Sequence, residues 1–344
     1  MHIRKSAGQS VHAALSEALP PGWFAPQRND ASFFSDFDSY ELLDPSQRAQ
    51  FAITPGEVRS MRNYRAVSGH FCLPTLLQVT EASSICTVLR EPRARLLSVY
   101  MYWRIPNLFQ AYEPYRVHLH AARSLNDVLS EPRLAEELDN AVCRRLLDDD
   151  PRLPPKRFAR QCDVASIAAD AIRRLETLGF VGVLESGESV WRGIGEVFGV
   201  TLRPAEANVT GDPSRTPLRM SSGETCFDHE SFDLLQERSA ADAIVYDHVL
   251  AHTVENESER ARIREGAFAR ELFKYSDLIC PVTESAAAET HPQNSAEIEE
   301  LRAELQRSRE ELEQARQSNA SIQGSASWRI TAPLRAAKRR LSTQ

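Results

Sequence analysis

Two short stretches of the chain carry residue types that suit the binding of a phosphate group. Arg90 follows a run of mostly β-branched and apolar residues, 85–89, and Ser98 lies eight residues further along. An arginine fork donates two parallel hydrogen bonds to a phosphate, and a nearby hydroxyl adds another. At the start of the chain, Lys5 places a mobile positive charge just ahead of Gly8. Together the two stretches predict an anion-binding site.

The expected secondary structure places both stretches at one edge of a sheet. Residues 85–89 predict a short buried strand, and Pro92 suits the first turn of a helix, where its missing N–H is no loss. Residues 2–10 predict a strand and a glycine-containing turn, followed by a helix over 11–19 that offers backbone N–H groups to an anion. Ligands of open α/β sheets bind at the carboxyl ends of the strands. The segment around Arg90, taken alone, is equally consistent with an ordinary strand–helix unit whose arginine is solvated.

A family resemblance makes the prediction more specific. The second stretch reads Arg90-Glu-Pro-x-x-Arg-x-x-Ser98-x-Tyr100. It resembles the segment with which sulfotransferases hold the 3′-phosphate of their cofactor, 3′-phosphoadenosine 5′-phosphosulfate (PAPS). By this resemblance, Arg90 and Ser98 bind the 3′-phosphate.

The start of the chain resembles the 5′-phosphosulfate loop of the same family. It reads His2-Ile-Arg-Lys-Ser-Ala-Gly-Gln-Ser10, where the family usually has His-Ile-Pro-Lys-Thr-Ala-Gly-Thr-Ser. The resemblance implies that these residues surround the 5′-phosphate: Lys5, Ser6, Gly8, Gln9 and Ser10. It also implies that Lys5 stabilises charge on the bridging oxygen as that oxygen leaves.

The first segment departs from the family pattern at two positions and is short. Arg4 replaces the usual proline, a change that we expect to matter little, and Gln9 replaces a threonine, which puts one phosphate hydrogen bond in doubt. Only three residues precede Arg4, whereas strands commonly have about five or six. Either the first strand is unusually short, or the true start of the protein lies upstream of Met1.

His70 is the candidate general base. Residues 65–71 predict a strand that ends at Gly69 and His70. In the carbohydrate branch of the family a similar Gly-His-Phe stretch lies between the two phosphate segments, and its histidine deprotonates the acceptor hydroxyl. Imidazole suits this role because it titrates near neutral pH. The alternative is a histidine held by a backbone carbonyl at the end of a strand.

Later segments extend the resemblance. An amphipathic helix is predicted over 165–178 and a buried strand over 180–184, and this strand resembles the family's third core strand. Glu185 follows it and is expected to hydrogen-bond either the acceptor or the surrounding structure.

Two further segments are predicted to face the ligands. In the loop 208–225, the resemblance implies that Arg215 or Arg219 contacts the nucleotide. Loops of this length often act as lids, although a solvated loop is an equal alternative. The irregular helical stretch 105–155 is predicted to face the acceptor, by analogy with the family alone.

The end of the chain differs in composition from the rest. Residues 281–297 read as a linker, and 298–318 show the spacing of a coiled coil of about three heptads, which predicts either a homodimer or a lone solvated helix. Residues 319–344 form a basic tail whose Ser-Trp-Arg sequence resembles the tails of bacterial surface-polysaccharide glycosyltransferases. The part over 325–341 suits contact with a membrane surface or a partner.

Composition sets outer limits on the function. The 42% hydrophobic content supports a packed core, and the net charge of −7 argues against a nucleic-acid partner. The six cysteines show no metal-binding spacing, so no metal is expected and the thiols read as reduced, as in the cytoplasm. No long apolar run predicts a membrane span. We therefore expect a cytoplasmic protein that contacts the inner membrane only peripherally, through its tail.

The sequence as a whole predicts one α/β domain over residues 1–280, with a P-loop-like three-layer fold around a central parallel sheet. The predicted reaction is transfer of a sulfuryl group from PAPS to a hydroxyl of a carbohydrate, such as a cell-surface polysaccharide or glycolipid precursor. The alternatives are a non-catalytic PAP-binding or scaffold protein (PAP is PAPS without its sulfuryl group) and a sulfotransferase for a non-sugar acceptor. A P-loop kinase is disfavoured because no Gly-x-x-x-x-Gly-Lys-[Ser/Thr] string occurs.

Overall fold

The chain divides into two units, Met1–Pro281 and Val282–Gln344. The computed structural model describes residues 1–25, 27–34, 44–104, 123–204 and 227–275. The predicted linker, coiled coil and basic tail lie outside these residues, as do Arg215, Arg219 and the stretch 105–122. In the described part, no helix combines the length and the apolar character that crossing a membrane requires.

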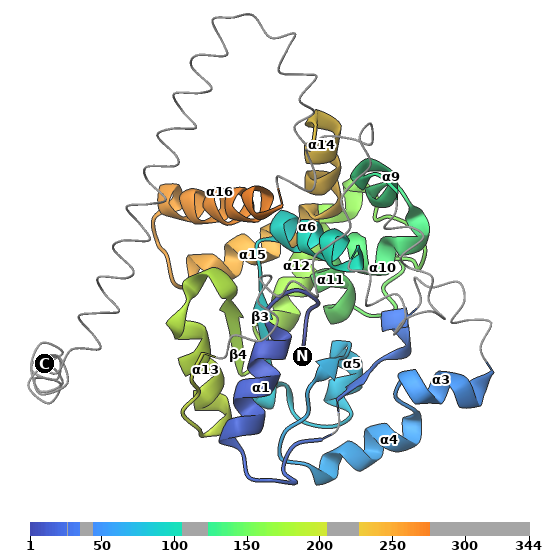
Figure 1. The fold of residues 1–344 in the computed structure, drawn as a ribbon, viewed down its shortest axis with the longest axis vertical. Coiled ribbons are helices and arrows are strands. Elements are labelled where there is room, and N and C mark those ends of the chain that lie inside the picture. The colour runs from blue at the N-terminus through green and yellow to red at the C-terminus, as the bar shows by residue number, and fades with distance from the viewer. Residues whose placement is uncertain (26, 35–43, 105–122, 205–226, 276–344) are drawn as a thin grey trace, which may run out of the picture. The chain divides into compact units, whose positions relative to one another are not determined.

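The strands of the described residues form two parallel pairs, the second of which is labelled in Figure 1. The first pair is β1 (Arg28–Asn29) with β2 (Gly69–His70), and the second is β3 (Cys86–Leu89) with β4 (Phe180–Val183). The protein is therefore a mixed α/β protein with parallel strands. Within the described residues, however, the central sheet that we expected is two short pairs rather than one continuous sheet.

The first residues of the chain link the two strand pairs. The Met1 ammonium donates a hydrogen bond to the Cys86 carbonyl oxygen of β3 at 2.7 Å. The His2 N–H donates to the Gly69 carbonyl oxygen of β2 at 3.1 Å. Residues 1–3 thus lie between β2 and β3, where a first core strand was expected, although they are too few to form a regular strand.

Four helices position the candidate site. They are α1 (Gly8–Ala18), α6 (Pro92–Trp103), α15 (Ala240–Ala251) and α16 (Glu257–Lys274). The remaining α-helices in the described residues are α3 (Pro45–Phe51), α4 (Pro55–Ser60), α5 (Leu73–Leu77), α9 (Leu125–Leu129), α10 (Ala135–Leu138), α11 (Ala141–Leu146), α12 (Val164–Leu175), α13 (Glu188–Phe198) and α14 (His229–Arg238). The predicted helices after Pro92 and over 165–178 correspond to α6 and α12.

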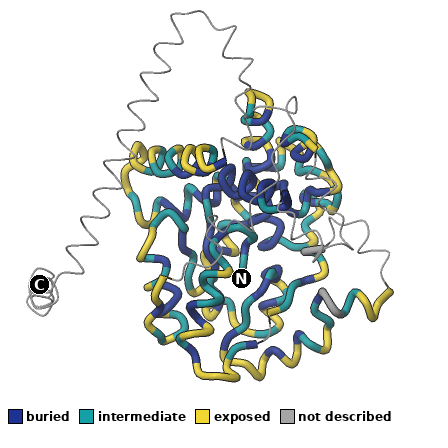
Figure 2. The backbone as a smooth tube through the Cα atoms, in the orientation of Figure 1, coloured by how far each residue is buried: buried dark blue, intermediate teal, exposed yellow. Residues whose placement is uncertain are grey.

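Helix α6 runs through the core. Every residue of it except Tyr102 is buried, and Figure 2 shows it dark along most of its length. Glu91 caps its start by accepting a hydrogen bond from the Ala94 N–H at 2.7 Å. Because the helix is buried all round, its arginines need partners inside the protein. Arg95 finds one in Glu137, whose Oε1 atom lies 3.2 Å from its Nη1.

Candidate anion-binding site

The loop over residues 3–7 is held in an unusual backbone conformation. Lys5 and Ala7 have φ angles of 66° and 61°, in the left-handed region that costs an L-residue roughly 1–2 kcal/mol. The Ser6 N–H donates to the Ile3 carbonyl oxygen at 3.2 Å, and Arg90 Nη1 donates to the Lys5 carbonyl oxygen at 3.1 Å. Strained backbone of this kind clusters at ligand sites, where the surrounding structure holds it.

The loop leads into a helix whose first turn suits an anion. Helix α1 begins at Gly8, and Ala7 before it makes no side-chain cap. No acidic residue lies in the first turn, so nothing there offsets the positive end of the helix dipole. Ser6 is buried, and its Oγ atom has no hydrogen-bond partner within the described residues. An anion at this turn would meet N–H groups and a hydroxyl.

Gly8 is required here by a close approach. A Cβ atom at this position would lie 1.7 Å from ring atoms of His2, so a side chain here would displace an imidazole that stacks on His70. The absence of a side chain therefore lets α1 begin directly against the first residues of the chain. Gln9, the next residue, is exposed.

Three cations gather at the carboxyl end of β3. Arg90 follows β3, and its Nη2 atom lies 2.5 Å from Oε2 of Glu271 on α16. Lys274, one helical turn further on, places Nζ 4.0 Å from the other carboxylate oxygen of Glu271. Lys5 shares this environment, and its Nζ lies 4.5 Å from the centre of the Tyr102 ring. These four side chains thus comprise three cations and one carboxylate, and the carboxylate pairs with Arg90 and Lys274.

This environment weakens the hold of Lys5 on its proton. Burial, together with the positive charges of Arg90 and Lys274, lowers the pKa of Lys5 to about 8, while Glu271 opposes the shift. At neutral pH the ammonium is still charged, as an anion site requires. Its charge becomes sensitive to moderately alkaline pH.

The predicted site residues are brought together only in part. The structure places Lys5 and Ser6 in one loop and Gly8 at the start of the helix that follows, and it brings Arg90 against the loop. Ser98 lies near the middle of α6 with 2% of its surface exposed, covered by the core. Arg215 lies outside the described residues.

His70 lies at the end of β2 and contacts the first residues of the chain. Its Nδ1 atom lies 3.0 Å from the His2 carbonyl oxygen, and the two imidazole rings stack with centroids 4.1 Å apart. A carbonyl oxygen only accepts, so Nδ1 carries the proton and Nε2 carries the lone pair. The contact with a backbone carbonyl matches the alternative expectation for His70. The role of general base stays a prediction, and in this tautomer Nε2 would be the atom that accepts the proton.

The pKa of His70 differs from the near-neutral value that was expected. Burial lowers its pKa well below the usual value, with further lowering by His2, Arg4 and Arg145. The imidazole is therefore neutral across the physiological range. It can accept a proton without first losing one, although it is a weaker base than a solvated histidine.

Several charged residues of this region were not found by sequence reasoning. No sequence pattern singled out Glu271 or Lys274, and 181 residues separate Glu271 from Arg90. Arg4, whose replacement of proline was expected to matter little, forms an ion pair with buried Glu137 at 3.5 Å. No local pattern signals either contact, since both depend on how distant helices pack.

No protein-family model matches the chain, and no characterised protein matches it significantly in sequence. Two features of the molecule bear on its function: the contacts of the site and the two short motifs. Those motifs are separated in the chain, yet the structure joins them through the hydrogen bond between Arg90 and the Lys5 carbonyl.

Proposed function

We propose that the protein transfers the sulfuryl group of PAPS to a hydroxyl group of a carbohydrate. The observation that carries the proposal is the contact between its two phosphate-binding motifs, in which Arg90 Nη1 donates to the Lys5 carbonyl oxygen at 3.1 Å. The motifs were identified separately, 85 residues apart, and a nucleotide with phosphates at both ends needs them close together. The P-loop-like three-layer fold is part of the same proposal.

The chemistry of the site suits an anionic nucleotide. Lys5, Arg90 and Lys274 provide positive charge, and Ser6 provides a buried hydroxyl that lacks a partner within the described residues. Lys5 and the first turn of α1 would hold the 5′-phosphate, and Arg90 the 3′-phosphate. Charge-assisted hydrogen bonds of this kind are the strongest that a protein offers to phosphate.

In the proposed reaction PAPS supplies an activated sulfuryl group, and the chain's own residues handle protons and charge. Nε2 of His70 accepts the proton of the acceptor hydroxyl, while the Nδ1–H bond to the His2 carbonyl keeps the ring oriented. The Lys5 ammonium donates a hydrogen bond to the bridging oxygen that gains negative charge as its bond to sulfur breaks. Positive groups that are already fixed in place need no reorganisation during this step.

A transfer assay tests the proposal. The purified protein is incubated with sulfur-labelled PAPS and bacterial cell-surface polysaccharides, and both labelled saccharide and released PAP are measured. Equal amounts of the two products are expected. Binding of PAP without transfer to any acceptor would favour the non-catalytic alternative, and label in a phenol, lipid or peptide would favour the non-sugar alternative.

The pKa of Lys5 predicts how PAP binding depends on pH. A lysine is charged below its pKa, so affinity should be highest below pH 8 and should fall as pH rises above it. Losing one charge-assisted hydrogen bond costs about 1.5–3 kcal/mol, and we expect roughly tenfold weaker binding at pH 9.5 than at pH 7. Phosphate groups are fully ionised over this range, since their second pKa is about 6.

Calorimetric titration with PAP at several pH values measures this effect. The control is Lys5→Arg, which stays protonated throughout and should show little dependence on pH. Equal affinity of the wild type at both pH values would show that the Lys5 ammonium does not contact the ligand.

A further inference from the structure

Within the candidate anion site, Glu271 already occupies a position that a phosphate group would need. This residue is 5% exposed, and its Oε2 atom accepts a hydrogen bond from Arg90 Nη2 at 2.5 Å. The other oxygen, Oε1, is buried without a hydrogen bond to any described residue, and the nearest cation to it is Lys274 at 4.0 Å. One carboxylate thus contacts two of the three cations of the site.

Two of the five N–H groups of Arg90 have hydrogen-bond partners inside the protein. Nη1 bonds the Lys5 carbonyl oxygen, and Nη2 bonds Glu271. A guanidinium grips phosphate best with two parallel N–H groups on one edge. A phosphate that binds Nη2 competes with Glu271 for that group, and its negative charge faces that of the carboxylate.

We propose that the Glu271 carboxylate competes with the phosphate group of the ligand for Arg90, and so determines which anions the site accepts. This inference rests on the proposed function. A carboxylate carries one negative charge and two acceptor oxygens, whereas a phosphate monoester carries about two charges and three oxygens. The site then admits a terminal phosphate and rejects singly charged anions.

Both Glu271 and the second cation that it pairs with lie on helix α16. Glu271 lies at the start of the last turn of α16, and its ion pair ties that end of the helix to the residue after β3. When a phosphate takes over Arg90, Glu271 keeps Lys274 as its neighbouring cation, one turn away on the same helix. The displaced carboxylate therefore still has a cation nearby.

Titration of variants with PAP tests the inference. Glu271→Gln removes the competing charge and keeps the shape of the side chain, so it should bind PAP about tenfold more tightly than the wild type. Glu259→Gln is the matched control, because Glu259 lies on the same helix with half of its side chain exposed and pairs only weakly, with Arg262 at 3.6 Å. The control should bind PAP with wild-type affinity.

A second variant covers the case in which Glu271→Gln fails to fold. Glu271→Asp keeps the charge but is one methylene shorter, so it should lose the contact with Arg90 and bind PAP about threefold more tightly. Wild-type or weaker affinity in the folded variants overturns the inference, while the proposed function stands as long as the wild type binds PAP. Binding only in the Glu271 variants supports the inference, and binding in none of the proteins overturns the proposed function itself.

Discussion

Replacing His70 with alanine is expected to lower the rate of sulfuryl transfer by about a hundredfold to ten-thousandfold, the usual loss when a general base is removed. The affinity for PAP should stay nearly unchanged, because the base contacts the acceptor and not the nucleotide. The hydrogen bond from Nδ1 to the His2 carbonyl fixes the tautomer that carries its lone pair on Nε2, the atom that would accept the proton. Steady-state turnover and calorimetric PAP titration measure the two effects separately.

Two controls distinguish proton transfer from a role in positioning. His70→Gln keeps a hydrogen-bonding group but cannot accept the proton, so it should be nearly as slow as the alanine variant. Because the pKa of His70 lies well below its usual value, wild-type turnover should not fall between pH 7.5 and pH 6. A variant that retains more than about a third of wild-type turnover would remove His70 from the mechanism. Glu185, which accepts a hydrogen bond from the Glu91 N–H at 3.1 Å, would then be the next candidate.

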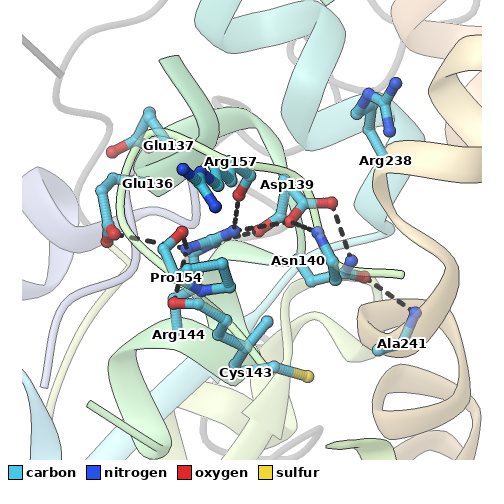
Figure 3. Close-up of polar contacts among 12 residues, drawn as sticks. Glu136, Glu137, Asp139, Asn140, Cys143, Arg144, Pro154, Arg157, Arg238 and Ala241 are labelled. Atoms are coloured by element: carbon cyan, nitrogen blue, oxygen red, sulfur yellow. Dashed lines mark hydrogen bonds and ion pairs between the residues drawn. The ribbon is translucent and has the colours of Figure 1, made fainter. Parts of the chain in front are cut away.

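The second large effect concerns stability. Arg144→Met should destabilise the fold by about 3–5 kcal/mol, because breaking a buried ion pair leaves its partner charged and unpaired. Figure 3 shows how Arg144 joins the segments on either side of it: its Nη2 bonds Asp139 Oδ2 at 2.7 Å, and both residues are almost fully buried. The guanidinium also donates to three backbone carbonyls further along the chain, those of Leu153, Pro154 and Arg157.

Urea unfolding of the purified proteins measures this change in the free energy of unfolding. The control is Arg173→Met, which removes an arginine whose side chain is 69% exposed and whose ion pair lies on the surface. Such pairs contribute about 0–1 kcal/mol. A loss below about 1 kcal/mol in Arg144→Met would mean that the buried network is not needed to hold residues 139–157 together.

The parts of the fold that the sequence predicted are those encoded within a few neighbouring residues. The apolar run before Arg90 forms β3, and Pro92 takes the first helical position of α6 with Glu91 as its cap. The contact between Arg90 and the loop of Lys5 followed from one rule, that the carboxyl ends of parallel strands share an edge. That rule needs no knowledge of side-chain packing.

What the sequence could not predict depends on packing between distant segments. The three residues before Arg4 are too few to show a strand pattern. The sequence therefore did not predict that Met1 and His2 each make one hydrogen bond to a different strand pair. The lowered pKa of His70 arises from burial and from Arg145, which lies far along the chain. The ion pair between Arg90 and Glu271 depends on where α16 crosses the end of β3, and no local pattern records that crossing.

The most direct test of the phosphate-site assignment is calorimetric titration of the full-length protein with PAP, repeated with Arg90→Ala and with Lys5→Ala. Each substitution removes charge-assisted hydrogen bonds that contribute about 1.5–3 kcal/mol. We therefore predict that Arg90→Ala binds PAP roughly tenfold to a hundredfold more weakly than the wild type, and that Lys5→Ala is also weakened. Unchanged affinity in both variants, or no binding of PAP by the wild type, would contradict the assignment of this site to the nucleotide.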